Sequence, residues 1–145
     1  MKIMSVDFGD ARTGLAMCDK TEFLASPIGV VHEKRFEHAV EKVAAAAIEN
    51  KAEAVIVGLP LNMNGFEGPR AELCRTFAAE LSEKISVPVR MWDERQTTVS
   101  AAGYLNQTDT RGKKRKAVVD AVAATIILES YMGWRKNNGK SITDF

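Results

Sequence analysis

Three acidic residues stand where the surrounding sequence is apolar. Asp7 ends the run IMSVD, Glu94 comes just after VPVRMW, and Asp120 lies inside AVVDAVAATIIL. A carboxylate in apolar surroundings costs several kcal/mol unless a cation accompanies it or its protonation changes. If the three acids converge, a site made of carboxylates alone favours Mg²⁺ or Mn²⁺ over zinc. Two such ions about 4 Å apart suit phosphodiester hydrolysis, in which they activate a water and stabilise the leaving oxygen.

Some of the acidic residues can also have structural roles instead of catalytic ones. Asp10 lies between glycines in an expected hairpin turn, where an Asp usually bonds local backbone. Asp93 can either cap a helix or assist the acidic site. Asp120 can pair with a nearby Lys or Arg instead of a metal, since perturbed acids also occur in structural ion pairs. No spacing brings His32 or His38 to these acids.

The elements that must position the acids follow from the hydrophobic pattern. Close apolar runs separated by short turns predict antiparallel strands, and later apolar runs alternate with helical periodicity. Pro69 is expected at a first helical position. The order predicts an α/β fold with a mixed five-stranded sheet, made of a three-strand antiparallel meander plus two parallel strands, with helices on both faces. Expected strands cover 2–7, 14–18, 23–31, 54–60 and 87–92, and expected helices cover 36–48, 69–85, a short segment from Thr97 or Thr98 to Tyr104, and 116 to about 135.

A basic run lies directly before Asp120. The segment RGKKRK, residues 111–116, holds five cations in six positions, although the net charge of the chain is only +1. We expect this run to form a loop that leads into the helix of Asp120, where its cations can contact phosphates. The alternative is an ordinary solvated loop.

Composition bounds the class of protein. A length of 145 residues suits a single domain, and 46% hydrophobic with 27% charged residues is a globular balance. No apolar run approaches the ~20 residues that span a membrane, and the N-terminus lacks a signal-peptide layout. We therefore expect a cytoplasmic chain that does not contact the membrane. Cys18 and Cys74 are expected to be small buried hydrophobic residues.

Four segments, taken together, resemble a known family. DFGDARTG, residues 7–14, resembles the D-x-G-x-x-R-x-G opening of the YqgF/RuvX proteins. VGLPLNMNG (57–65), DERQTT (93–98) and KAVVDAVAATIILESY (116–131) are similar to its later signatures, in the same order. Departures such as Thr13, Asn64 and Gln96 fall on no proposed metal ligand.

The resemblance implies a ribonuclease H-like, metal-dependent nuclease. Residues 1–136 would form one nuclease domain and residues 137–145 a flexible C-terminal tail. The family's catalytic and metal-binding acids fall on Asp7, Glu94 and Asp120, with Mg²⁺ or Mn²⁺ as cofactor. The implied partner is nucleic acid: the family is described both as maturing the 5′ end of the small-subunit (16S) ribosomal RNA precursor and as resolving Holliday junctions in DNA. The oligomeric state stays open, since no apolar stripe indicates a dimer.

Further residues are expected to contact or admit the nucleic acid. Gly9 and Gly14 would let the hairpin bend close to the substrate. Arg12 is either a phosphate contact or the partner of Asp10 or Asp19 in a surface ion pair. The expected nucleic-acid contacts are Arg12, Asn62, Arg95, Lys113, Lys114, Arg115 and Lys116.

Two other functions compete with the nuclease. An actin-like ATPase also opens with an Asp-x-Gly strand, but it needs two such domains to enclose ATP. A non-catalytic RNA-binding assembly factor would share the fold without needing the three acids. Metal binding separates it from a nuclease.

Overall fold

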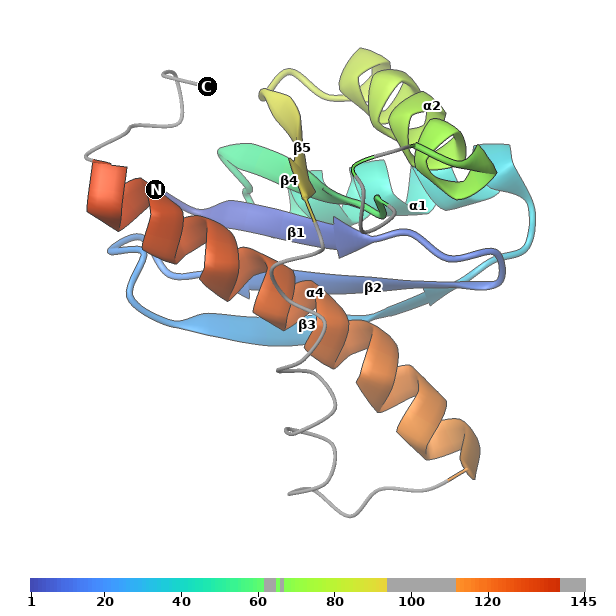
Figure 1. Cartoon of the computed structure of the whole chain (residues 1–145), viewed down its shortest axis with the longest axis horizontal. Helices are drawn as coiled ribbons and strands as arrows, with labels where there is room; N and C mark the ends of the chain where they lie inside the picture. The colour runs from blue at the N-terminus through green and yellow to red at the C-terminus, as the bar shows by residue number, and fades with distance from the viewer. Residues whose placement is uncertain (62–64, 66, 94–111, 139–145) are drawn as a thin grey trace.

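The computed structural model describes residues 1–61, 65, 67–93 and 112–138, and for residues 112–120 it describes only the course of the helix. Its centre is a five-stranded sheet in the order β3-β2-β1-β4-β5 (Figure 1). Pairing is antiparallel from β1 to β2 and from β2 to β3, and parallel from β1 to β4 and from β4 to β5. The predicted mixed sheet is therefore confirmed. The strands are β1 (Ile3–Asp7), β2 (Arg12–Cys18), β3 (Ala25–His32), β4 (Ala54–Leu59) and β5 (Val89–Asp93).

Among the described residues, three helices cover the sheet, with α1 and α2 on one face and α4 on the other (Figure 1). The central strands β1 and β4 are buried on both faces, which explains their unbroken apolar sequences. Strand β3 lies at the sheet edge and is largely exposed. The helices are α1 (Phe36–Glu49), α2 (Pro69–Lys84) and α4 (Gly112–Asn138).

The α1 and α2 face holds the larger apolar core. Met4 and Val6 of β1 point to this side, and Phe8, just after the strand, continues it. Its ring stacks on that of Phe77, with centroids 4.4 Å apart, and meets the edge of Phe36 at 5.8 Å. Pro69 opens α2 at a first helical position, as predicted, because a missing N–H costs nothing there.

The residues between these in β1 point to the opposite face of the sheet, which α4 covers. Ile3 and Ala16 point toward α4 and pack with Ile56 against Ala124 and Leu128. The small side chain of Ala124 lies against the sheet, so the helix backbone approaches closely. The Oγ of Ser5 accordingly donates a 2.5 Å hydrogen bond to the backbone carbonyl of Ala124.

One expected element was wrong in its type. Residues 112–115 belong to the first turns of α4, whereas the sequence predicted a basic loop and a helix that begins only at Lys116. Lys and Arg are good helix formers, and no proline or cap residue separates them from the apolar helix that follows. The helix also continues to Asn138, two residues past the expected domain end at 136. The expected short helix from Thr97 or Thr98 to Tyr104 lies outside the described residues.

No helix in the described part of the chain is long and apolar enough to cross a membrane.

Candidate active site

The carboxyl ends of the parallel strands meet at one edge of the sheet. Val6 of β1 pairs with Val57 of β4, and Val57 pairs with Met91 of β5. Asp7 ends β1 one position beyond this row, and Asp93 ends β5 two positions beyond it, opposite Leu59. Strands that run parallel gather their functional groups at this edge. Glu94 directly follows Asp93 in the chain and lies outside the described residues.

Strand alternation aims Asp7 toward the face of α4. Ser5 and Ile3, two and four positions earlier in the same strand, both contact that helix. Because side chains alternate along a strand, Asp7 belongs to the same face. Its side chain is half-buried. The carboxylate therefore lies at the edge of a packed layer and still reaches solvent.

Helix α4 runs back along β1 in the opposite direction (Figure 1). Ala124 is fixed above Ser5 by the hydrogen bond described above. Residue 120 lies one helical turn before Ala124, a step of about 6 Å along the helix. Asp7 lies two residues beyond Ser5, a step of about 6.6 Å along the strand. Both steps lead toward the same edge, so the backbone of residue 120 is on the Asp7 side of the Ser5 contact.

The turn between β1 and β2 is tight. A Cβ atom on Gly9 would stand 2.1 Å from the backbone carbonyl oxygen of Arg12, so only glycine fits there. Gly14 is buried and pairs with Asp7 across the two strands. Arg12 begins β2 at the same edge, paired with His32 of β3, and is half-buried.

Asp10 has a structural partner far away in the sequence. Its side chain is 86% exposed, and its Oδ1 accepts a 2.6 Å bond from Nη1 of Arg70, at the start of α2. The sequence predicted only local backbone bonds for Asp10. It did not indicate the contact with Arg70, because Arg70 is 60 residues away in the chain. Asp19, the other suggested partner of Arg12, accepts bonds from Thr21 and from the backbone of Phe23. Those bonds lower the pKa of Asp19.

The loop after β4 starts from the same edge. Its two ends are joined by a bridge between Leu61 and Glu67, and the carboxylate of Glu67 pairs with Arg75 of α2. Hydrogen bonding to Arg75 lowers the pKa of Glu67. Asn62 sits within this loop, outside the described residues.

The remaining expected site residues are only partly placed. The basic residues 113–116 fall in the first turns of α4, ahead of residue 120, and Arg95 lies outside the described residues. Among the side chains that the structure describes, no three His, Cys, Asp or Glu residues form a metal-sized group, and Glu94 and Asp120 are not among those side chains. His32 is exposed, and His38 lies 3.9 Å from Glu33 of the loop before α1. The described cysteines are buried and free of disulfides, as expected.

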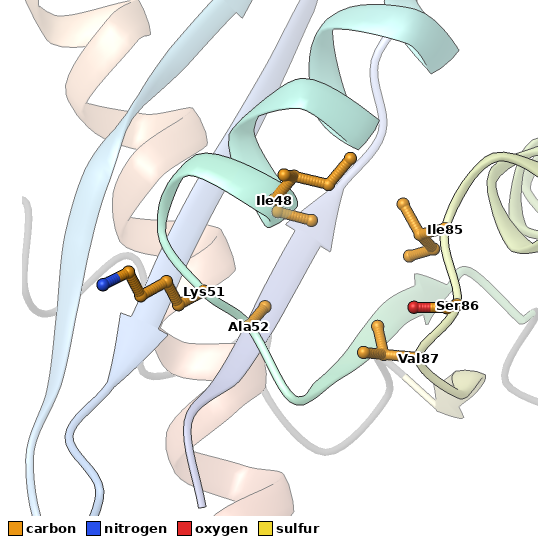
Figure 2. Close-up of a pocket in the computed structure, with 7 residues that line it drawn as sticks. Ile48, Lys51, Ala52, Ile85, Ser86 and Val87 are labelled. Carbon is orange, nitrogen blue, oxygen red and sulfur yellow. The ribbon is translucent and has the colours of Figure 1, made fainter.

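A pocket of about 200 Å³ lies at the opposite edge of the sheet (Figure 2). Ala52 and Val87, which line it, precede β4 and β5, so it opens at the amino ends of these strands. None of its lining residues is acidic. It therefore offers no ligands for the chemistry of the Asp7 edge.

The mixed five-stranded sheet in the order β3-β2-β1-β4-β5 matches the ribonuclease H-like fold that the sequence predicted. Solved structures support this fold. A Thermus thermophilus RuvC in complex with a Holliday junction substrate superposes with a TM-score of 0.60 at 17% identity, covering 92% of this chain and 96% of that one. The Fowlpox virus Holliday junction resolvase gives 0.55 at 18% identity, covering 92% and 99%.

The family is shown by the sequence matches. The family model described as "RuvX: Holliday junction resolvase" matches residues 1–133. A Halothermothrix orenii protein named "Putative pre-16S rRNA nuclease" is 42% identical over 93% of this chain and 96% of its own length. A protein of the same name from Listeria monocytogenes is 40% identical over 91% and 97%. The chain belongs to the RuvX family, and the resemblance seen in its four segments is confirmed.

Proposed function

We propose that this chain is a metal-dependent nuclease that uses Asp7, Glu94 and Asp120 as its catalytic acids. The observation that carries the proposal is the position of Asp7. It ends the central strand on the face covered by α4, and the backbone of residue 120 lies one helical turn before Ala124, on the Asp7 side of the Ser5 contact. Glu94 is the next residue in the chain after Asp93, which ends β5.

The donor set suits hard divalent cations. Three carboxylates without a nearby His or Cys are the ligands that Mg²⁺ and Mn²⁺ prefer. Asp7, Glu94 and Asp120 would hold the metal, which when bound supplies charge for activating water and stabilising the leaving oxygen. The half-buried position of Asp7 keeps its carboxylate oriented by the packed strand while leaving it open to substrate.

The substrate we favour is the 5′ end of the 16S ribosomal RNA precursor. Relatives about 40% identical over nearly the whole chain are named "Putative pre-16S rRNA nuclease", and the choice of the 5′ end follows the family resemblance. Processing of this RNA would place the protein in the cytoplasm. The second candidate is a four-way DNA junction, which the description of the matching family model favours.

The nucleic acid would cross the edge at which β1, β4 and β5 end. Arg12 at this edge, and the basic start of α4, would neutralise phosphates. Asn62 and Arg95 complete the proposed contacts from the neighbouring loops.

Neutralising Lys113, Lys114, Arg115 and Lys116 together tests the basic contacts. Each lost phosphate contact should flatten the log–log salt dependence of binding by roughly 0.7 to 0.9. Fluorescence anisotropy across a salt series measures the slope. If the slope is unchanged, these cations are only the solvated start of a helix.

The function itself is tested with matched substrates. A 16S precursor fragment and a four-way DNA junction are incubated with the wild-type protein and Mg²⁺ or Mn²⁺, with Asp7→Asn as the control. Cleavage of the RNA alone supports the favoured substrate, and cleavage of the junction alone supports the second. Tight RNA binding without cleavage, and with no metal binding, would identify an assembly factor instead.

A further inference from the structure

Arg70 forms the contact between α2 and the turn that follows the proposed catalytic Asp7. It is the second residue of α2, and its guanidinium donates from Nη1 to Oδ1 of Asp10 and from Nη2 to the backbone carbonyl of Phe8. The same guanidinium carbon lies 5.2 Å from the centroid of the Phe8 ring. One side chain thus holds the turn through a carboxylate, a carbonyl and a ring.

These contacts act on the residue next to Asp7. Phe8 is held from two sides, since its ring stacks on Phe77 while Arg70 covers it and binds its carbonyl. The bound carbonyl belongs to the peptide that joins Phe8 to Gly9, so Arg70 holds the backbone directly after Asp7. Together with the held Phe8 ring, this limits the directions in which the Asp7 side chain can point. Strand pairing ends at Asp7, opposite Gly14, so sheet hydrogen bonds do not extend this order into the turn.

Arg70 also joins the two loops that flank Asp7. It lies three residues after Glu67, which closes the loop after β4, and it binds the turn after β1. Movement of α2 would therefore shift both loops against the sheet. A displacement of about 1 Å in a catalytic group can cost about 10²-fold in rate.

We infer that Arg70 is a positioning residue, which orients Asp7 through Phe8 and Asp10 and does not itself bind the substrate. The inference rests on the proposed nuclease function. Phe8 points to the face of α1 and α2, whereas Asp7 points to the face of α4. Two of the donors of Arg70 are engaged on the face away from Asp7. The rival role is a phosphate contact through the remaining N–H donors of the guanidinium, since 37% of the side chain is exposed.

Steady-state kinetics separate the two roles, on whichever substrate the wild type cleaves. Arg70→Ala should lower kcat at least tenfold, change KM by less than about twofold, and leave the salt slope of binding unchanged. Arg70→Lys should recover part of kcat, because an ammonium can reach one of the two acceptors but not both. Lys84→Ala removes the same charge from the far end of α2 and should behave as the wild type.

Hydrogen exchange tests the contact without any substrate. Exchange in the peptide covering residues 8–12 should be at least tenfold faster in Arg70→Ala than in the wild type or in Lys84→Ala. Unchanged exchange overturns the inference. A raised KM with unchanged kcat and a salt slope lower by roughly 0.7 to 0.9 also overturns it, in favour of a phosphate contact. If the wild type cleaves neither nucleic acid, the proposed function fails, and the exchange rates alone decide whether Arg70 orders the turn.

Discussion

The face of the sheet beneath α1 and α2 differs in chemistry from the face beneath α4. Under α1 and α2, three phenylalanine rings pack within 6.1 Å of one another, centroid to centroid, among aliphatic side chains. Under α4, Ser5 binds a helix carbonyl, and Arg135 is only 6% exposed. Asp7, the proposed catalytic acid whose side chain the structure describes, belongs to the second face, where polar groups are already accommodated. The first face supplies apolar packing, so substitutions in its buried core should act mainly on stability.

The largest expected effect is on activity at the α4 face. Asp7→Asn, Glu94→Gln and Asp120→Asn should each abolish cleavage while leaving the fold intact, since the loss of one ligand removes or misplaces a metal. Asp10→Asn keeps an oxygen acceptor for Arg70 and should retain most activity. Cleavage assays and circular dichroism of all four variants measure both properties. An inactive Asp10→Asn beside an active Asp7→Asn would reverse the two assignments.

On the face covered by α1 and α2, substitutions in the core should lower the stability of the fold. Phe77 is fully buried and stacks on Phe8, so Phe77→Ala should lower the free energy of unfolding by about 3–5 kcal/mol. Urea unfolding measures this change. A loss below about 1 kcal/mol would show that this face is not the main stabilising core. Phe23→Ala is the matched control, because that ring is 84% exposed and should matter little.

A third prediction concerns the cost of placing acids together. If Asp7, Glu94 and Asp120 converge, their charges repel one another without metal. In EDTA at neutral pH, Asp120→Asn should therefore melt at or above the wild type. Mn²⁺ should reverse the order, because only the wild type gains binding-linked stability, about 2.7 kcal/mol at a hundredfold excess over Kd. Thermal melts in EDTA and in Mn²⁺ provide the measurement. Strong destabilisation of the mutant in EDTA would make Asp120 a structural ion-pair partner.

The smallest expected effect concerns the ion pair that fastens the end of α4. The carboxylate of Glu22 accepts bonds of 2.6 and 3.1 Å from Arg135. Burial raises the pKa of Glu22, but these bonds and one from the Met1 ammonium outweigh burial and lower it. The unfolded chain thus binds the proton more readily. The stabilisation that this ion pair contributes is complete above the pKa of Glu22 in the unfolded chain, about 4.3. It is lost as the pH falls through the pKa of Glu22 in the folded chain.

Glu22→Gln should lower the free energy of unfolding by about 1–2 kcal/mol at pH 7, and the difference should shrink below about pH 4. Urea unfolding at several pH values measures it. Glu83→Gln, an exposed acid on α2, is the control and should leave the curve unchanged. A pH-independent loss would assign the effect of Glu22→Gln to packing instead of charge.

Local sequence was sufficient for the elements and their order. Apolar runs marked all five strands, and Pro69 marked the start of α2, because strand burial and helix entry depend on neighbouring residues. The same reasoning was wrong at residues 112–115, where a dense run of cations suggested a loop although Lys and Arg favour helix. The four family segments also indicated the ribonuclease H-like fold and predicted Asp7 as the acid of β1.

Contacts between distant residues needed the folded chain. Arg70 meets Asp10 across 60 residues, Arg135 meets Glu22 across 113, and Ser5 meets Ala124 across 119. No periodicity or spacing indicates such pairs, because they depend on how the helices lie against the sheet. From the sequence, the flanking glycines predicted that Asp10 bonds only local backbone in a turn, and no role was predicted for Arg70. Sheet order and helix direction bring these groups together, since the parallel strands end at one edge and α2 begins beside it.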